Sequence, residues 1–381
     1  MITNEPLHYL DNAATTMVAP AVATAVFDAM QAHWANPSSL YPIGARSEEA
    51  LAAARASLAR TLGCTPREFY FTSCGTESNN MAIGGFAKSK KFGKKIIVSG
   101  FEHPSVQRPI EQLAQEGYEV ITIKPEADGH LDIDKMLNAV DKGTILVACM
   151  LINNETGVRN PVERLAAEVK KINNRTAVHV DAVQAWFKTP ITLANIDSLS
   201  VSGHKIHAPK GIGGLYLAEK NWQTFAPPYL GGEQERQRRP GTENIPYAIG
   251  LATAAGLLSK TIKPRATAAA ALNAQLRAGL AQFAEVSINS PADASPEILN
   301  LSEHCIKSQT MLSFLAQQQI YVSSGSACGR GAPSHTLAAM GKSPRAIDTA
   351  LRVSLCAENT AADIDAFLNR LEDGLKTLQR F

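Results

Sequence analysis

Three short stretches place polar side chains directly after a probable strand, where they could act together on a ligand. The first is FTSCGTESNN, residues 71–80. Gly75 and Thr76 turn the chain there, and we expect a helix to begin at Glu77 or Ser78. The free N–H groups and the dipole of a helix N-terminus can bind an anion such as phosphate. An ordinary cap by Thr76 or Ser78 explains the same residues, so this stretch alone leaves both interpretations open.

The second stretch, HVDAVQA (179–185), ends an apolar run with a carboxylate. Asp181 falls at the carboxyl edge of the expected strand, where ligands bind in α/β sheets. It could cap the next helix or pair with a buried cation. Gln184 follows three residues later and faces the same way if a helical turn begins there. Taken alone, Asp181 fits the capping role better.

The third stretch, SVSGHKIHAPKGIGG (200–214), brings a lysine to the end of another short apolar run. Ser202, His204 and Lys205 follow that run, and a lysine in this position could form a Schiff base with a carbonyl group. The alternative is a solvated surface lysine. Lys210 lies close by in a Pro/Gly turn, and we interpret it as structural.

Together these parts match the needs of one cofactor, pyridoxal phosphate. Its phosphate needs N–H and hydroxyl donors, its pyridine nitrogen needs a carboxylate to stay protonated, and its aldehyde needs a lysine amine. A ring over the face of the cofactor is also expected, and FEHPSV (101–106) supplies His103 for it. The sequence therefore predicts a pyridoxal phosphate site.

A fourth stretch, VSSGSACGRGAPSH (322–335), carries a thiol among small residues that offer little bulk to bury it. The thiolate is the nucleophilic form, and Arg330 or His335 could lower the pKa of Cys328. The other five cysteines, at 64, 74, 149, 305 and 356, show no CxxC spacing. They predict neither a zinc framework nor a redox pair, and we expect most of them to be small core residues.

Short runs rich in Val, Ile and Tyr supply the strands that must position these side chains. We expect strands at 68–73, 95–100, 119–124, 144–151, 177–182, 198–203 and 213–218. Helical segments lie between them, and in the segment 161–173 Val162, Leu165 and Val169 recur at helical spacing. Repeated strand–helix units predict an α/β fold, with a mainly parallel sheet and helices on both faces.

The pattern changes near residue 250, where the chain becomes rich in alanine. We expect long helices at 248–262 and 266–283 and an amphipathic helix at 360–379. Residues 16–255 are therefore interpreted as a large cofactor-binding domain. Residues 1–15 and 256–381 are interpreted as a smaller α+β domain.

The composition limits the partners that this chain can have. It has 381 residues, 45% of them hydrophobic, and a formal net charge of +2. Such a balance gives no reason to expect nucleic acid or an anionic membrane as partner. No apolar stretch reaches the roughly 20 residues needed to span a bilayer, and the first residues lack the features of a secretion signal. Six scattered cysteines favour reduced thiols and a cytoplasmic location.

The sequence resembles the cysteine desulfurases, in the class V aminotransferase group of fold type I pyridoxal-phosphate enzymes. The resemblance runs almost end to end and rests on ten ordered blocks. These blocks are YLDNAATT (9–16), NPSSLYPIGARSEEA (36–50), TSCGTESNN (72–80), EHPSV (102–106), NNETGV (153–158), VDAVQA (180–185), SGHKIHAPKGIGGLY (202–216), GGEQERQRRPGTEN (231–244), VSSGSAC (322–328) and LRVSL (351–355). SSGSAC is typical of the subgroup that supplies sulfur for iron–sulfur clusters and thiolated cofactors.

The resemblance implies a role for each matching residue. Lys205 would bond to the cofactor aldehyde and shuttle the Cα proton, and Asp181 would pair with the pyridine nitrogen. Gln184 would hydrogen-bond the ring hydroxyl, while His103 would stack on the ring and help with proton transfer. The residues that would bind the phosphate are Gly75, Thr76, Ser202 and His204.

The resemblance also implies a homodimer with shared sites, because Thr242 would reach the phosphate of the other subunit. Asn154 would contact the cofactor and, with Arg352, hold the substrate carboxylate, a task that suits a planar guanidinium. Cys328 would take sulfur from L-cysteine as a persulfide, leaving L-alanine, and would deliver it to an acceptor protein. No role for a metal ion is implied.

The sequence departs from the family pattern at several positions beside the expected site. Tyr41 stands where the family has a histidine, His207 and Ala208 follow the lysine, and Trp186 and Phe187 are unusually bulky. None of these changes removes an expected catalytic residue. With these changes, the pattern does not identify the acceptor protein or the preferred substrate.

Three other functions fit parts of the same pattern. A selenocysteine lyase would keep the cofactor residues and depend less on Cys328, and a class V aminotransferase would return an amino group to a keto acid. The SSGSAC block disfavours both. A catalytically silent binding protein is disfavoured because Lys205, Asp181, His103 and Arg352 are retained together.

Overall fold

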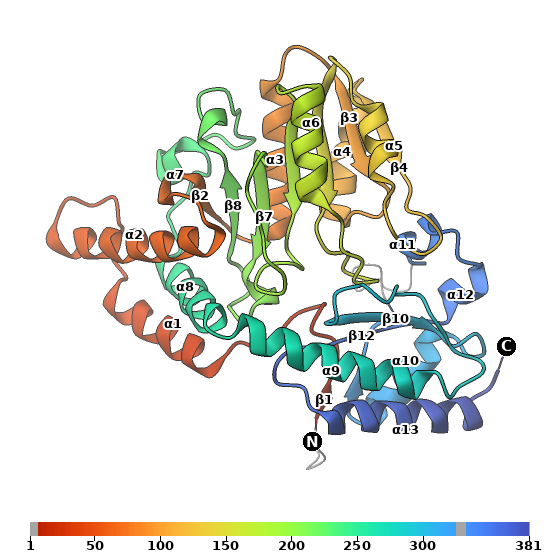
Figure 1. The fold of residues 1–381 in the computed structure, drawn as a ribbon. Coiled ribbons are helices and arrows are strands. Elements are labelled where there is room, and N and C mark those ends of the chain that lie inside the picture. The colour runs from red at the N-terminus through yellow and green to blue at the C-terminus, as the bar shows by residue number, and fades with distance from the viewer. Residues whose placement is uncertain (1–6, 325–332, 381) are drawn as a thin grey trace.

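A seven-stranded sheet forms the centre of the larger part of the chain (Figure 1). The computed structural model describes residues 7–324 and 333–380. The strands stand in the order β2-β8-β7-β6-β5-β3-β4. Their bounds are β2 Phe69–Thr72, β3 Lys95–Ser99, β4 Glu119–Ile123, β5 Thr144–Met150, β6 Ala177–Asp181, β7 Ser198–Ser202 and β8 Gly213–Leu217. All seven lie within the ranges expected from the sequence, so these predictions are confirmed.

The sheet is mainly parallel, as expected, with β8 as the exception. Strands β4, β3, β5, β6 and β7 pair in parallel, whereas β8 pairs antiparallel with both β7 and β2. Strands β5, β6 and β7 are buried along their whole length. Their carboxyl ends therefore meet at one edge, as ligand sites in such sheets require.

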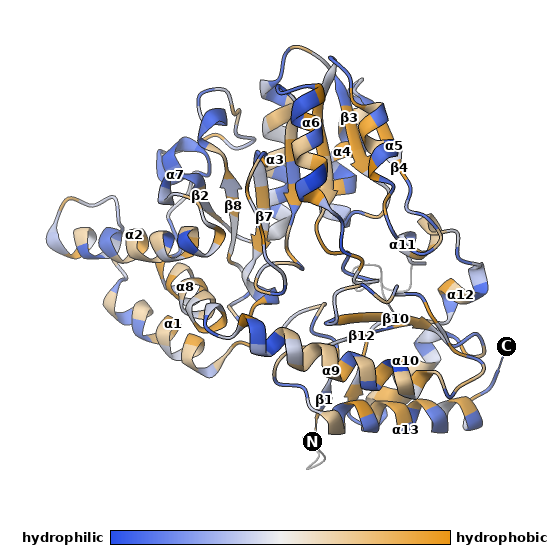
Figure 2. Cartoon of the chain, in the orientation of Figure 1, coloured by the Kyte–Doolittle hydropathy of each residue, from blue (hydrophilic) through white to orange (hydrophobic). Residues whose placement is uncertain are grey.

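Helices cover both faces of the sheet, and their apolar sides face it (Figure 2). One face packs against α3 (Gly75–Ser89) and α4 (Pro104–Gln115). The other face packs mainly against α5 (Ile133–Ala139) and α6 (Val162–Ile172), with α1 (Pro20–Ala32), α2 (Pro42–Leu62) and α8 (Ile245–Ser259) alongside. The short elements of this part are η1 (Pro66–Glu68), η2 (Gly203–Lys205), η3 (Glu219–Asn221) and α7 (Gln234–Gln237).

Helix α3 begins earlier than the sequence suggested. Its first residue is Gly75 rather than Glu77 or Ser78. Neither Thr76 nor Ser78 is the capping residue, because the N-cap is Cys74 in an extended conformation, with no side-chain cap. The hydroxyl of Ser78 donates instead to the backbone oxygens of Cys74 and Gly214. Gly75 thus completes the turn from β2 into α3. The first backbone N–H groups of α3 lie beside the carboxyl edge of the sheet.

The remaining elements form a second core beside the sheet edge. A small antiparallel sheet has the order β12-β10-β9, and β1 pairs in parallel with β11. Helices α9, α10 and α13 contribute apolar side chains to the same core. The bounds are β1 His8–Tyr9, α9 Ile262–Leu280, β9 Ser287–Ile288, β10 Ile298–Ser302, α10 Ser308–Gln317, β11 Ile320–Tyr321, α11 His335–Ala339, α12 Pro344–Asp348, β12 Ala350–Ser354 and α13 Ala361–Thr377.

The division at residue 256 remains a proposal, and the elements suggest a slightly later position. Residue 256 falls inside α8, which packs on α1 and α2. A boundary between α8 and α9, at 260–261, keeps that packing intact. No single helix in the described part of the chain is long and apolar enough to cross a membrane. Helices α8 and α9 taken together have the length and composition of a membrane span, but the pair is bent by 73°.

Candidate functional site

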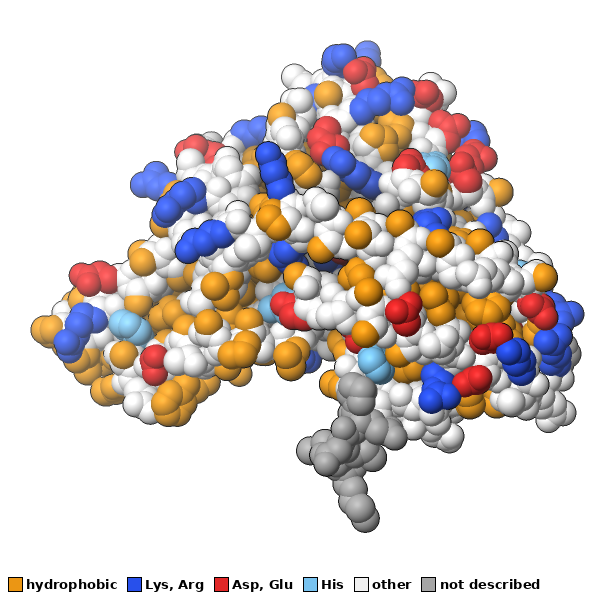
Figure 3. All heavy atoms as spheres, turned by 60° about the horizontal axis from the view of Figure 1, so that its bottom comes forward, with side chains coloured by type: hydrophobic (Ala, Val, Ile, Leu, Met, Phe, Trp, Pro, Cys, Tyr) orange, Lys and Arg blue, Asp and Glu red, His pale blue; other side chains and the backbone are white. Residues whose placement is uncertain are grey.

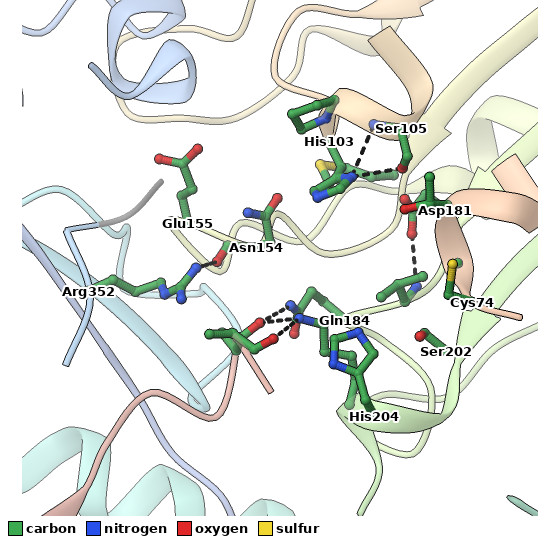
Figure 4. Close-up of a pocket in the computed structure, with 18 of the residues that line it drawn as sticks. Cys74, His103, Ser105, Asn154, Glu155, Asp181, Gln184, Ser202, His204 and Arg352 are labelled. Atoms are coloured by element: carbon green, nitrogen blue, oxygen red, sulfur yellow. Dashed lines mark hydrogen bonds between the residues drawn. The ribbon is translucent and has the colours of Figure 1, made fainter. Parts of the chain in front are cut away.

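The carboxyl ends of β5, β6 and β7 open into one cavity of about 220 Å³ (Figure 4). Segments far apart in the sequence contribute to its wall. The lining residues are Ala13, Ala14, Cys74, Gly75, Thr76, His103, Pro104, Ser105, Met150, Asn154, Glu155, Asp181, Val183, Gln184, Ser202, His204, Lys205, His335 and Arg352. Nine of the residues that the sequence singled out as cofactor ligands are therefore brought together here: Gly75, Thr76, His103, Asn154, Asp181, Gln184, Ser202, His204 and Lys205.

Lys205 ends the short helix η2, directly after β7, and lines the cavity. Its Nζ donates to the backbone oxygens of Ala13 at 2.5 Å and Ala14 at 2.7 Å. Two carbonyl oxygens from the first segment of the chain thus hold the amine in place. Lys210, five residues later, is exposed and does not line the cavity.

One end of the cavity offers donors for an anion. Ser202, at the end of β7, is 2% exposed, and its hydroxyl has no hydrogen-bond partner among the described residues. Gly75 begins α3 there, and a Cβ at this position would lie 2.5 Å from Cγ2 of Val183. His204 lies beside them, and burial lowers its pKa to about 4, with Lys205 adding to the effect. A buried hydroxyl and a side-chain-free helix N-terminus make this end suitable for phosphate.

Asp181 ends β6 and is 4% exposed. Its two oxygens accept from different neutral donors: Asn79 Nδ2 at 2.8 Å and the backbone N–H of Val183 at 2.9 Å. The second bond is the local turn contact that a capping role would give. The residue nevertheless also lines the cavity, so the structure combines the two roles that the sequence left open.

Gln184 faces the same cavity, three residues after Asp181. Its Nε2 donates to the backbone oxygen of Ala13 at 2.9 Å, and its Oε1 accepts from Lys188 Nζ at 2.9 Å. The amide is therefore fixed from both sides. Burial lowers the pKa of Lys188 to about 8.

A chain of hydrogen bonds fixes the orientation of His103. The Nδ2 group of Asn79 donates to Asp181 and also to Ser105 Oγ at 2.8 Å, so the Ser105 hydroxyl must direct its own proton elsewhere. That proton reaches His103 Nδ1 at 2.7 Å, and the backbone N–H of Ser105 donates to the same nitrogen at 3.1 Å. Because Nδ1 is the acceptor, the proton of neutral His103 lies on Nε2.

The same contacts disfavour a charged His103. Burial lowers the pKa of His103, while Asp181 opposes the change and Lys205 and His335 add to it. Protonation would also make Nδ1 a donor, facing the hydroxyl and the backbone N–H of Ser105, which are both donors. His103 is thus held as a neutral ring, positioned by its place as N-cap of α4.

Arg352 lies on β12, 1% exposed, and reaches the cavity from the smaller part of the chain. Its Nη1 donates to the backbone oxygen of Asn154 at 2.9 Å, and its Nη2 pairs with Asp11 Oδ1 at 2.7 Å. These contacts fix the plane of the guanidinium. The side chain of Asn154 also borders the cavity (Figure 4).

Glu155 is a residue of the site that sequence reasoning missed, although it lies in the NNETGV block. It is 2% exposed and lines the cavity. It accepts from Thr336 Oγ1 at 3.0 Å and from Ser334, the N-cap of α11. His335, between Ser334 and Thr336 in the sequence, bonds the backbone oxygen of Glu102 through Nε2 at 2.8 Å. Asn79, Ser105 and Cys74 were missed as well, because nothing in their local pattern distinguishes them from ordinary helix and turn residues.

Of the expected site residues that the structure describes, one does not lie in this cavity. Thr242 is exposed and lines no part of it, which its expected role toward the other subunit requires. Cys328 lies outside the described residues. The described residues on either side border the site: Ser323 pairs through its backbone with Arg352, and Ser334 bonds Glu155.

The remaining cysteines follow the expectation in part. Cys149 and Cys305 are buried, whereas Cys64, Cys74 and Cys356 are half-buried. Burial raises the pKa of Cys64 to about 12 and that of Cys356 to about 12. Trp186 and Phe187 are buried too, with their rings 4.8 Å apart.

The fold is that of the class V aminotransferases. The family model described as "Aminotransferase class-V" matches residues 8–367. The cysteine desulfurase of Nostoc sp. (strain PCC 7120) is 38% identical over 381 residues, covering 97% of this chain and 93% of that protein. A solved structure titled "NIFS-LIKE PROTEIN" has a TM-score of 0.92 at 34% identity, and covers 98% of this chain and 100% of its own.

A third relative is a structure titled "SspA in complex with cysteine". It has a TM-score of 0.81 at 30% identity and covers 92% of this chain and 99% of its own. The chain belongs to the class V aminotransferase family and, within it, to the cysteine desulfurases.

Proposed function

We propose that the chain is a pyridoxal-phosphate-dependent cysteine desulfurase, which converts L-cysteine to L-alanine and transfers the sulfur to Cys328. The observation that carries the proposal is the joining of Lys205, Asp181 and Arg352 in one cavity of a chain from this family. Each supplies a different function: an amine, a buried carboxylate and a guanidinium.

The cavity fits pyridoxal phosphate at both ends. The buried hydroxyl of Ser202, which bonds none of the described residues, and the Gly75 turn suit the phosphate, with Thr76 and His204 beside them. At the other end Asp181 accepts from two neutral donors among the described residues, which leaves it a suitable partner for a protonated ring nitrogen. When bound, the cofactor would supply an electron sink for bond breaking at the amino acid.

The residues of the chain would divide the remaining work. Lys205, held by two carbonyl oxygens, would bind the cofactor and move the Cα proton. Arg352, with Asn154 beside it, would orient the substrate carboxylate. His103 would cover the ring and donate from Nε2, since the hydrogen bonds place its proton there.

Besides the cofactor, sulfur transfer needs the substrate and an enzyme thiol. The Cys328 thiolate would attack the substrate sulfur, so that an S–S bond forms as the C–S bond breaks. The electron pair of the C–S bond stays on carbon, which takes up protons to give alanine. The enzyme keeps a persulfide, and no external oxidant or reductant is required. Support comes from the flanking residues Ser323 and Ser334, which are bonded to the cavity residues Arg352 and Glu155.

The test is incubation of the wild-type protein and Cys328→Ser with L-cysteine and cofactor. Wild type should release alanine and carry one sulfane sulfur on Cys328, detected by mass spectrometry. The serine variant should bind cofactor and substrate but release little alanine, because a hydroxyl is barely ionised near neutral pH. Full desulfuration by Cys328→Ser would favour the selenocysteine lyase alternative, and transamination without sulfur release would favour an aminotransferase.

We further propose that the protein acts as a homodimer. Large apolar side chains gather on the outer side of α1 and α2, which Figure 3 shows at its left edge. Phe27 is 61% exposed and Trp34 71% exposed, with Met30, Leu40 and Tyr41 close to them in sequence. Such a patch marks an interaction surface. The exposed Thr242 would then reach the phosphate site of the partner.

The acceptor of the sulfur is proposed to be another protein, in the assembly of iron–sulfur clusters or other sulfur-containing cofactors. A cytoplasmic location goes with this role. Neither nucleic acid nor membrane is proposed as a partner. Incubation of the persulfide form with candidate scaffold proteins, followed by detection of sulfane sulfur on the scaffold, tests the acceptor.

A further inference from the structure

Three potential metal ligands meet outside the set of residues that line the cavity. His207 follows the lysine helix η2, while Cys356 and Glu358 lie in the loop between β12 and α13. The imidazole, thiol and carboxylate atoms lie within 4.8 Å of one another. They come from the two parts of the chain that border the cavity, and none of them lines it.

His207 is oriented with one ring nitrogen toward this cluster. The residue is 8% exposed, and its backbone N–H donates to Thr16 Oγ1 at 2.8 Å. Its Nδ1 lies 3.1 Å from the backbone oxygen of Met17, which can only accept, so Nδ1 carries a proton. A second bond of this kind is what orients a metal-binding histidine, because it leaves the lone pair on Nε2.

That lone pair faces a carboxylate. Nε2 of His207 lies 3.6 Å from Glu358 Oε2, which is too long for a good hydrogen bond. Two electron-rich atoms then face each other unless a cation lies between them. Two ligands of one tetrahedral zinc ion are about 3.4 Å apart, close to the observed separation.

The loop that carries the other two ligands is held in place. Asn359 Oδ1 accepts from the backbone N–H of Cys356 at 2.8 Å, and Asn359 Nδ2 donates to Tyr9 at 3.0 Å. The thiol of Cys356 is half-buried beside the Glu358 carboxylate, and a metal ion bound there would take it as a thiolate.

We propose that His207, Cys356 and Glu358 form a binding site for one zinc ion. A nitrogen, a sulfur and an oxygen ligand suit Zn²⁺, with water in the fourth position. Thiolate and carboxylate together balance the charge of the ion, which matters because Lys188 and Arg265 lie nearby. The site would link the loop after Lys205 to the loop after Arg352, and so hold the two halves of the cofactor cavity together.

The experiment measures zinc uptake by the holoenzyme in a Cys328→Ser background, which removes the thiol of the sulfur-transfer segment. Zn²⁺ is titrated against a chromophoric chelator, and Co²⁺ is added separately to record a thiolate-to-cobalt charge-transfer band in difference spectra. The test variants are Cys356→Ser and His207→Asn. Asparagine is chosen because His207 has φ of 61°, a conformation that asparagine tolerates. The control is Cys64→Ser, since that thiol is also half-buried with a pKa of about 12.

We expect one zinc ion per chain and a cobalt–thiolate band in the parent and in Cys64→Ser. Cys356→Ser and His207→Asn should each weaken zinc binding by at least about tenfold and abolish or shift the band. Cofactor content, read from the visible spectrum, identifies any variant that has failed to fold. Two results would overturn the proposal: no stoichiometric zinc binding in the parent, or zinc affinity in both folded test variants equal to that of the parent. Either would leave an ordinary thiol–carboxylate hydrogen bond.

Discussion

At the scale of single residues, one asparagine organises two groups with proposed roles at the cofactor, Asp181 and His103. Asn79 donates to Asp181 and Ser105 and accepts from His179 Nε2 at 3.0 Å, while His179 Nδ1 bonds Ser198 at 2.8 Å. Full burial lowers the pKa of His179 to about 3, so this ring remains neutral. Because the Asp181 carboxylate only accepts, Asn79 turns Nδ2 toward it and Oδ1 toward His179, whose proton therefore lies on Nε2. The amide of Asn79 therefore has one possible orientation, and the Nε2 tautomer of His103 follows from it.

Removal of the Ser105 hydroxyl should raise the pKa of His103. In Ser105→Ala one of the two donors to Nδ1 is lost, which stabilises the protonated ring by about 1 kcal/mol, or roughly 0.7 pKa units. Burial still lowers the pKa, so the value should stay below that of an exposed histidine. Nitrogen NMR of labelled histidine across pH measures both the pKa and the tautomer. An unchanged pKa, or a proton on Nδ1 in the wild type, would contradict the assignment.

Lys205→Ala should abolish turnover and the covalent attachment of cofactor. No other amine from the described residues lines the cavity, so borohydride should fix pyridoxal phosphate to the wild type and not to the variant. Lys210→Ala is the matched control, because that lysine is exposed and outside the cavity. Borohydride-dependent labelling of Lys205→Ala would show that the lysine assignment is wrong.

Asp181→Asn should retain some cofactor but lose activity by at least about 100-fold. The amide carries no charge to keep the ring nitrogen protonated. It must also fit between two donors, Asn79 Nδ2 and Val183 N–H, with a single oxygen. Steady-state kinetics at saturating cofactor measures the loss. Turnover near the wild-type rate would mean that this carboxylate does not act on the ring.

At the scale of elements, the start of α3 should be more sensitive than its middle. Gly75→Ala would place a Cβ 2.5 Å from Val183 Cγ2, beside the phosphate end of the cavity. We expect cofactor affinity to fall by about tenfold, or about 1.4 kcal/mol. Gly84→Ala in the same helix is the control, since a Cβ there meets nothing within 4 Å. It should stabilise the fold by about 0.5–1 kcal/mol, because alanine restricts the unfolded chain. Equal cofactor affinity in both variants would refute the close contact at Gly75.

Most of the elements could be predicted from the sequence, because buried strands leave a strong local pattern. All seven strands of the main sheet fall on short runs rich in apolar residues, and the polar residues after β6 and β7 lie at the edge that parallel topology dictates. The antiparallel direction of β8 was not visible, since strand direction depends on the connections and not on composition.

The contacts that orient the site residues were beyond prediction for another reason. The carbonyl oxygens of Ala13 and Ala14, which hold Lys205, are backbone atoms and leave no trace in residue type. Asn79 and Glu155 act through partners about 100 and 180 positions away in the chain. Such pairs are defined only once the sheet and the second core have packed together.

At the scale of the whole molecule, the segment that carries Thr242 is firmly attached to the body of its own chain. Arg55 and Glu235 form a buried bidentate pair, with N–O distances of 2.6 and 2.7 Å. Arg239 bonds Glu77 at 3.0 Å, in the first turn of α3. The segment thus holds a fixed position between α2 and α3, from which Thr242 can serve a second subunit.

A mixed dimer tests whether Thr242 serves the partner. Thr242→Ala alone should lower cofactor affinity, and Lys205→Ala alone should be inactive. In a dimer of one chain of each kind, one site combines both defects. The other site has its own Lys205 and the partner's Thr242 intact. The two differently tagged chains are co-expressed, and the mixed dimer is isolated. Its activity is measured at a cofactor concentration that leaves Thr242→Ala homodimers mostly empty. Under that condition the mixed dimer should show about half of the wild-type activity per dimer. If Thr242 served its own chain, every site of the mixed dimer would carry one defect, and that recovery would not occur.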